Sequence, residues 1–60
     1  MTRQHFIDAF EEELRRQRIQ FTQGDVKDFV DRHWPAIVND PDPRKWSREF
    51  LDRGHGSVTV

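Results

Sequence analysis

The sequence predicts a small all-α fold, a three-helix bundle with a flexible C-terminal tail. Apolar residues recur at helical spacing in three separate segments of the 60-residue chain. Each segment begins with a residue that suits a helix N-cap, and the last segment is followed by glycine. We therefore expect one helical domain over residues 1–54 and a tail over residues 55–60.

The first helix is predicted over residues 2–18, with Thr2 as its cap. Its buried face is a stripe of apolar side chains: Phe6, Ile7, Phe10 and Leu14. The basic residues near its end complement the negative C-terminal pole of the helix dipole. Ile19 and Phe21 follow in a short connector, and we expect both to reach the core.

The central helix, predicted over residues 23–38, carries the strongest local signals. The Thr22 hydroxyl can accept from a free N–H of the first turn, and Asp25 has the spacing of a capping box. One face collects Val26, Phe29, Val30, His33, Trp34, Ile37 and Val38. Pro35 has no N–H for the helical hydrogen bond to Asp31, so we expect a kink or a break there.

The third helix is predicted over residues 43–53. Asp42 suits its N-cap, Pro43 its first position and Gly54 its C-terminal end. Trp46, Phe50 and Leu51 should face inward. In the tail, residues 58–60 have strand propensity but no visible partner, so we expect them to be frayed.

The predicted core is small, and this favours association with another chain. Short domains bury a smaller fraction of their surface than larger ones, and the chain has no cysteine for a disulfide. Ten basic and eleven acidic residues give a net charge of −1, which lacks the basic footprint of many nucleic-acid-binding domains. No apolar run is long enough for a signal peptide or a membrane span, so we expect a cytoplasmic protein without membrane contact.

The sequence shows no enzyme motif, and we expect neither catalysis nor a cofactor. There is no nucleophile motif, no phosphate-binding glycine loop and no cysteine. The three histidines, His5, His33 and His55, do not have the spacing of a helical metal site. His33 lies on the apolar face and is interpreted as a residue at the core margin, with a pH-sensitive contact as the alternative.

The acidic residues of the central helix form a second pattern, at Asp25, Asp28 and Asp31. Carboxylates near a helix start are explained by the helix dipole. We interpret these three as a solvated face, with a salt bridge to another helix or a partner as the alternative and a metal site as the weakest hypothesis.

The predicted partner-binding residues are Arg44, Lys45 and Arg48 on the third helix, together with Trp34 and Trp46 beside the proline turn. The cations suit phosphate or an acidic protein patch. Tryptophan is enriched in interface hot spots, although a core position is the alternative for both residues.

These features predict a non-catalytic protein–protein interaction module or accessory subunit, whose partner is another protein or a second copy forming a homodimer. A nucleic-acid-binding module that uses the third helix is the alternative, and a structural piece of a larger assembly is a third class. A helix-turn-helix formed by the second and third helices is disfavoured, because the predicted turn is longer than the usual three or four residues and is rich in proline.

Overall fold

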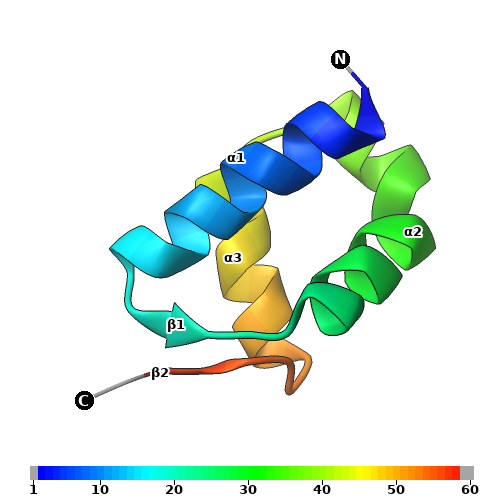
Figure 1. Ribbon diagram of the computed structural model, residues 1–60. Helices are drawn as coiled ribbons and strands as arrows, with labels where there is room; N and C mark the ends of the chain where they lie inside the picture. The colour runs from blue at the N-terminus through cyan, green and yellow to red at the C-terminus, as the bar shows by residue number, and fades with distance from the viewer. Residues whose placement is uncertain (1, 59–60) are drawn as a thin grey trace.

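The computed structural model describes residues 2–58, which form three helices and a small two-stranded sheet (Figure 1). The elements follow in the order α1 (Arg3–Arg16), β1 (Ile19–Gln20), α2 (Gln23–Asn39), α3 (Pro43–Asp52) and β2 (Ser57–Val58). The predicted helical fold is confirmed, and each helix agrees with its predicted range to within two residues at either end.

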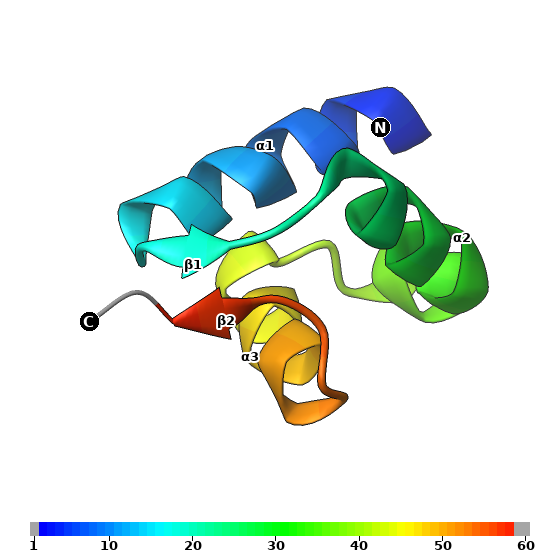
Figure 2. The ribbon, with the colours of Figure 1, turned by 60° about the horizontal axis from the view of Figure 1, so that its bottom comes forward.

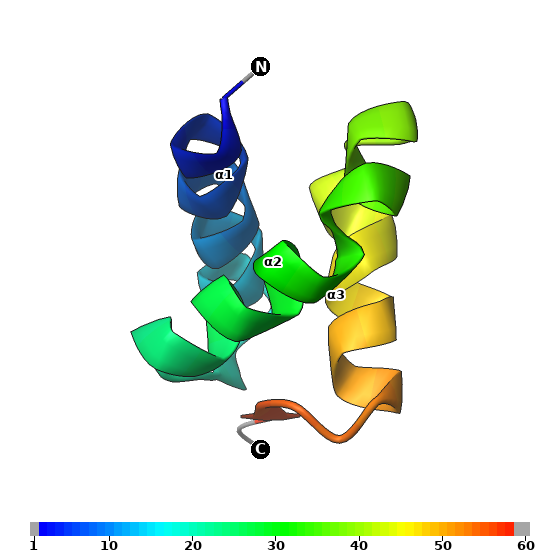
Figure 3. The same cartoon turned by 90° about the vertical axis from the view of Figure 1, so that its right-hand side faces the viewer.

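Helix α1 packs against both other helices. In Figure 3, α1 and α3 run beside each other and α2 crosses in front of both. The two strands lie together at one end of the bundle, where the chain leaves α1 and where it returns after α3 (Figure 2).

All three predicted N-caps are confirmed. Each cap side chain accepts a hydrogen bond from a backbone N–H in the first turn of its helix, and such a bond stabilises the helix by about 1 kcal/mol. The three bonds are Thr2 Oγ1 to His5 N at 3.1 Å, Thr22 Oγ1 to Asp25 N at 3.2 Å and Asp42 Oδ1 to Arg44 N at 3.1 Å.

The core is built from side chains of all three helices and β1. Eleven apolar side chains are buried: Phe6, Ile7, Phe10, Leu14, Ile19, Val26, Phe29, Val30, Ile37, Trp46 and Phe50. Phe21, Trp34 and Leu51 pack against them and stay partly exposed. The predicted core position of Val38 is wrong, because this side chain is 54% exposed. Adjacent helical residues point about 100° apart, so at the end of α2 only Ile37 faces inward.

Helix α2 continues through Pro35 to Asn39 without a break. The proline removes one backbone hydrogen bond, but Val30 and Ile37 are both fully buried on either side of it, so packing holds the helix together. Because α2 reaches Asn39 and α3 begins at Pro43, the turn between them has only three residues, 40–42.

The chain after α3 differs from the frayed tail that the sequence led us to expect. Strand β2 pairs antiparallel with β1, with Ile19 opposite Val58 and Gln20 opposite Ser57. The connector after α1 is extended and supplies the partner that was not visible in the sequence. Within the expected tail, residues 59 and 60 lie outside the part of the chain that the structure describes.

Two glycines let the chain turn back from α3 toward β1. Gly54 and Gly56 have φ angles of +86° and +63°, in the left-handed region that favours glycine. A Cβ atom on Gly56 would lie 2.8 Å from both the Gln20 carbonyl oxygen and Phe50 Cε2, whereas a Cβ on Gly54 would meet nothing within 4 Å.

We expect Gly56→Ala to lower the free energy of unfolding by about 2–5 kcal/mol, from backbone strain and overpacking together. Gly54→Ala is the matched control, since it carries only the backbone strain of about 1–2 kcal/mol. Urea denaturation of both variants measures the difference. Equal losses in the two variants would mean that the close packing at residue 56 contributes nothing.

Candidate functional site

The three-residue turn between α2 and α3 is held by a small polar network around Asp40. The carbonyl oxygen of Asp40 accepts from Trp46 Nε1 at 2.7 Å and from the Asp42 N–H at 2.9 Å. Its carboxylate accepts from Lys45 Nζ at 2.6 Å, and this hydrogen bond is the main cause that raises the pKa of Lys45. The turn is therefore fixed by side chains of the helix that follows it.

The two tryptophans both pack on the core. Trp46 is 8% exposed and is anchored by its bond to Asp40, so it offers a partner little surface. Trp34 is partly exposed and lies edge-on to Phe6, with 6.2 Å between ring centroids. Their role in partner binding stays a prediction, and Trp34 has the more accessible side chain.

The predicted basic residues of α3 all lie on its exposed surface. Lys45 is paired with Asp40, whereas Arg44 and Arg48 form no ion pair with any residue in the range 2–58. These two residues are one helical turn apart and share a face. The structure thus leaves two guanidinium groups of α3 free for an external anion.

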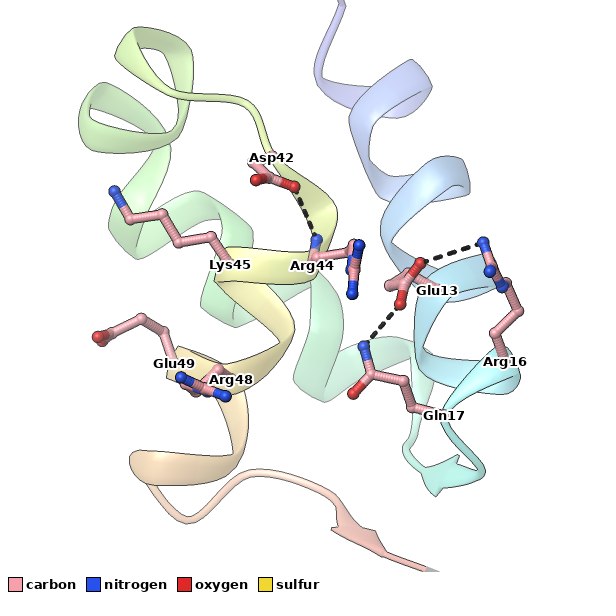
Figure 4. Close-up of a pocket in the computed structure, with 8 residues that line it drawn as sticks. All are labelled: Glu13, Arg16, Gln17, Asp42, Arg44, Lys45, Arg48 and Glu49. Atoms are coloured by element: carbon pink, nitrogen blue, oxygen red, sulfur yellow. Dashed lines mark hydrogen bonds and ion pairs between the residues drawn. The ribbon is translucent and has the colours of Figure 1, made fainter.

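Arg44 and Arg48 border a groove between α1 and α3 (Figure 4). Arg16 of α1 lines the same groove and lies on the outer side of α1 in this view, while Arg44 extends from α3 toward Glu13. That Arg16 joins the basic residues of α3 could not be predicted, because the two helices are far apart in the chain.

The acidic residues of the groove are already engaged within the protein. Glu13 accepts from Gln17 at 2.6 Å and lies 3.7 Å from an Arg16 nitrogen. Glu49 pairs with Arg53 at 3.3 Å. Asp42 caps α3. Ion pairs therefore leave Arg44 and Arg48 as the unpaired cations of the groove, beside the Asp42 carboxylate, which forms no ion pair with any residue in the range 2–58.

A buried hydroxyl with no signal in the sequence fixes the end of α1 against α3 beside this groove. Ser47 is 1% exposed, and its Oγ donates to the Arg44 carbonyl at 2.7 Å. The same oxygen accepts from Nε2 of Gln17, the C-cap residue of α1, at 3.0 Å. A serine among the polar residues of α3 carries no local sign of this role, which depends on where α1 packs.

Asp28 and Asp31 lie on an exposed face of α2, as predicted, and only the pair of Asp31 with Arg3 matches the alternative of a salt bridge to another helix. Asp28 pairs with Arg32 at 3.0 Å, and Asp31 pairs with Arg3 of α1. Asp25 does not form the predicted capping box but lies 2.9 Å from His55. Within residues 2–58 no group of three metal-binding side chains comes together.

The histidines lie in different environments. His5 is exposed, and His33 is partly buried at the core margin as predicted, with its ring centroid 4.6 Å from that of Phe29. His55, expected in a frayed tail, instead stacks on Phe50 at 5.1 Å between centroids.

The comparisons do not assign this chain to a family: no protein-family model, curated protein or solved structure matches it. Among the helices of residues 2–58, none is both long enough and apolar enough to cross a membrane. The site must therefore be interpreted from its own geometry.

We expect the free energy of unfolding to decrease as the pH falls below 6.5. Burial, followed by the positive charge of Arg53, lowers the pKa of His33 from its ordinary value of 6.5. The unfolded chain therefore binds the proton more readily than the folded chain. The contribution of His33 to stability is full above pH 6.5 and is lost as the pH falls through the lower pKa of the folded state.

Urea denaturation between pH 8 and pH 5 measures this effect. His33→Gln should remove its share of the pH dependence, and His5→Gln, at an exposed histidine, is the control. A His33→Gln profile parallel to that of the unchanged protein would contradict the assignment. The charged or titratable groups around His33 are Arg32, Glu49, Arg53 and His55, and they are the same in both variants.

Proposed function

We propose that the protein binds double-stranded DNA, with α3 as the helix that enters the major groove. The observation that carries this proposal is that a three-residue turn joins α2 to α3, and that α3 exposes two arginines, which form no ion pair with any residue in the range 2–58. DNA binding was the alternative function that the sequence suggested, and we now favour it over protein binding.

The turn length removes the objection that the sequence raised against a helix-turn-helix. DNA-binding helix-turn-helix motifs join two helices by a turn of three or four residues, and the second helix lies in the major groove. Here α2 extends to Asn39, so Asp40, Pro41 and Asp42 alone form the turn. Pro41 is compatible with this position because it lies between the helices.

The exposed side chains of α3 suit this mode of binding. The N-terminal residues of a recognition helix contact base edges, and Arg44 and Arg48 lie in the first and second turns of α3. Arginine forms bidentate hydrogen bonds with guanine in the major groove. We expect Arg16, which lines the same groove from α1, to contact a flanking phosphate.

The net charge of −1 sets the expected strength of binding rather than excluding it. Most of the affinity of DNA-binding proteins at low salt comes from phosphate contacts. Because Asp28 and Asp31 are paired with Arg32 and Arg3, their repulsion of DNA is reduced. We therefore expect modest affinity with a steep dependence on salt.

The proposal is tested by fluorescence anisotropy with a labelled DNA duplex over a range of salt concentrations. The association constant should fall as salt rises, with a logarithmic slope of about −0.9 for each phosphate that the protein neutralises. Arg44→Ala and Arg48→Ala should each weaken binding, and a contact to a phosphate would also reduce the slope by about 1. Both changes should alter the free energy of unfolding by less than about 0.5 kcal/mol, because the side chains are exposed.

Arg32→Ala is the matched control, since it removes an exposed arginine from α2 that is paired with Asp28. It leaves the Asp28 carboxylate without its partner, so it should weaken DNA binding, but by less than either change on α3. Absence of binding at low salt, or an equal loss from Arg32→Ala, would rule out α3 as the DNA-contacting helix.

An acidic protein partner at the same groove is the second candidate, because Arg44 and Arg48 suit its carboxylates. Glu13 and Glu49 lie beside these arginines and have partners within the protein. Among residues 2–58 the large exposed apolar side chains are Val38 and Val58, so such an interface would be mainly polar. Sedimentation equilibrium tests the homodimer: a dimer that Arg44→Ala dissociates would favour this candidate over DNA.

A further inference from the structure

We infer that His55 is a positioning residue, which fixes the C-terminal end of α3 against the N-terminal end of α2 through its contact with Asp25. Nδ1 of His55 lies 2.9 Å from Oδ1 of Asp25, a residue 30 positions earlier in the sequence. Asp25 is in the first turn of α2, and His55 follows the end of α3.

This contact completes a pair of polar links at the two ends of the helix pair. At one end, Trp46 Nε1 donates to the Asp40 carbonyl and holds the turn. At the other end, the His55–Asp25 contact joins the start of α2 to the segment after α3. Two links at opposite ends restrain the direction of α3 relative to α2, in addition to the packing of Phe50 on Phe29 and the bond between Gln17 and Ser47.

The surroundings of His55 make the contact specific to this side chain. Its ring stacks on Phe50 at 5.1 Å and meets Phe29 edge-on at 5.6 Å between centroids. Its backbone N–H donates to the Phe50 carbonyl at 3.0 Å. The left-handed conformations of Gly54 and Gly56 allow the chain to hold the imidazole in this position.

The geometry also assigns the tautomer of the neutral imidazole. An ionised carboxylate only accepts hydrogen bonds, so the ring nitrogen that faces Asp25 must carry the proton. His55 is therefore the Nδ1–H form when neutral. Asp25 is the charged group in direct contact with the ring nitrogen of His55. His33 is a second titratable group nearby, because both histidine rings pack against Phe29.

The consequence for DNA binding rests on the proposed function, but the contact itself does not. Arg44 and Arg48 project from α3, so a change in the direction of α3 would move both relative to the duplex. Loss of the contact should thus weaken DNA binding about 2- to 30-fold, the range seen when a residue acts on a binding site without touching the ligand.

The contact is tested first without DNA, by ¹⁵N NMR of the histidine ring at pH 9 and by amide hydrogen exchange. We expect the proton of His55 on Nδ1. His55→Phe keeps a ring but loses the donor, and His55→Asn keeps a donor but loses the ring. Both should lower the protection of the β2 amides, and Asp25→Ala should add no further loss in the His55→Phe background. A proton on Nε2 alone, or additive losses, would overturn the contact.

The positioning role is then tested by DNA affinity in the same variants. His55→Phe should weaken binding, with His55→Asn closer to the unchanged protein, and Asp28→Ala serves as the control on α2. Unchanged affinity in His55→Phe, with β2 protection lost, would overturn the positioning role. If the unchanged protein binds no DNA, the proposed function fails, while the NMR and exchange results still decide whether the contact exists.

Discussion

The packing around the ring of Phe29 is the interaction on which the rest of the structure depends. This ring stacks on Phe10 of α1 at 5.8 Å and meets Phe50 of α3 edge-on at 5.2 Å between centroids. It also contacts the rings of Trp46, His33 and His55. One fully buried side chain of α2 thus joins α1, α3 and the segment that leads to β2. In a domain this small, aromatic rings supply a large share of the buried apolar area.

Polar contacts then fix how the elements sit around this apolar centre. Gln17 and Ser47 link α1 to α3, Asp40 and Trp46 hold the turn, and Asp25 contacts His55. Among the residues that the structure describes, no buried side-chain nitrogen or oxygen lacks a hydrogen-bond partner. Since an unsatisfied buried polar group costs about 1–3 kcal/mol, these contacts favour one arrangement of the helices over others with the same apolar contacts.

The same contacts decide which charges remain on the surface for a partner. The aspartates of α2 are engaged with Arg3, Arg32 and His55. Lys45 is committed to the turn. Among the residues that the structure describes, the charged side chains of α3 that form no ion pair are Arg44, Arg48 and Asp52. Pairing within the protein thus sets a local pattern of charge that the total charge does not reveal.

The sequence by itself determined the helices, because their signals are local. The caps at Thr2, Thr22 and Asp42 act within one turn, and apolar spacing marks the buried face of each helix. The basic residues of α3 were also predicted. Only the tertiary structure decided the turn length, the pairing of β1 with β2 and the contacts of His55 and Ser47. Each of the latter three joins residues 30 or more positions apart, and two-residue strands are too short to show a period. These features arise when α1 packs against the other helices and brings distant segments together.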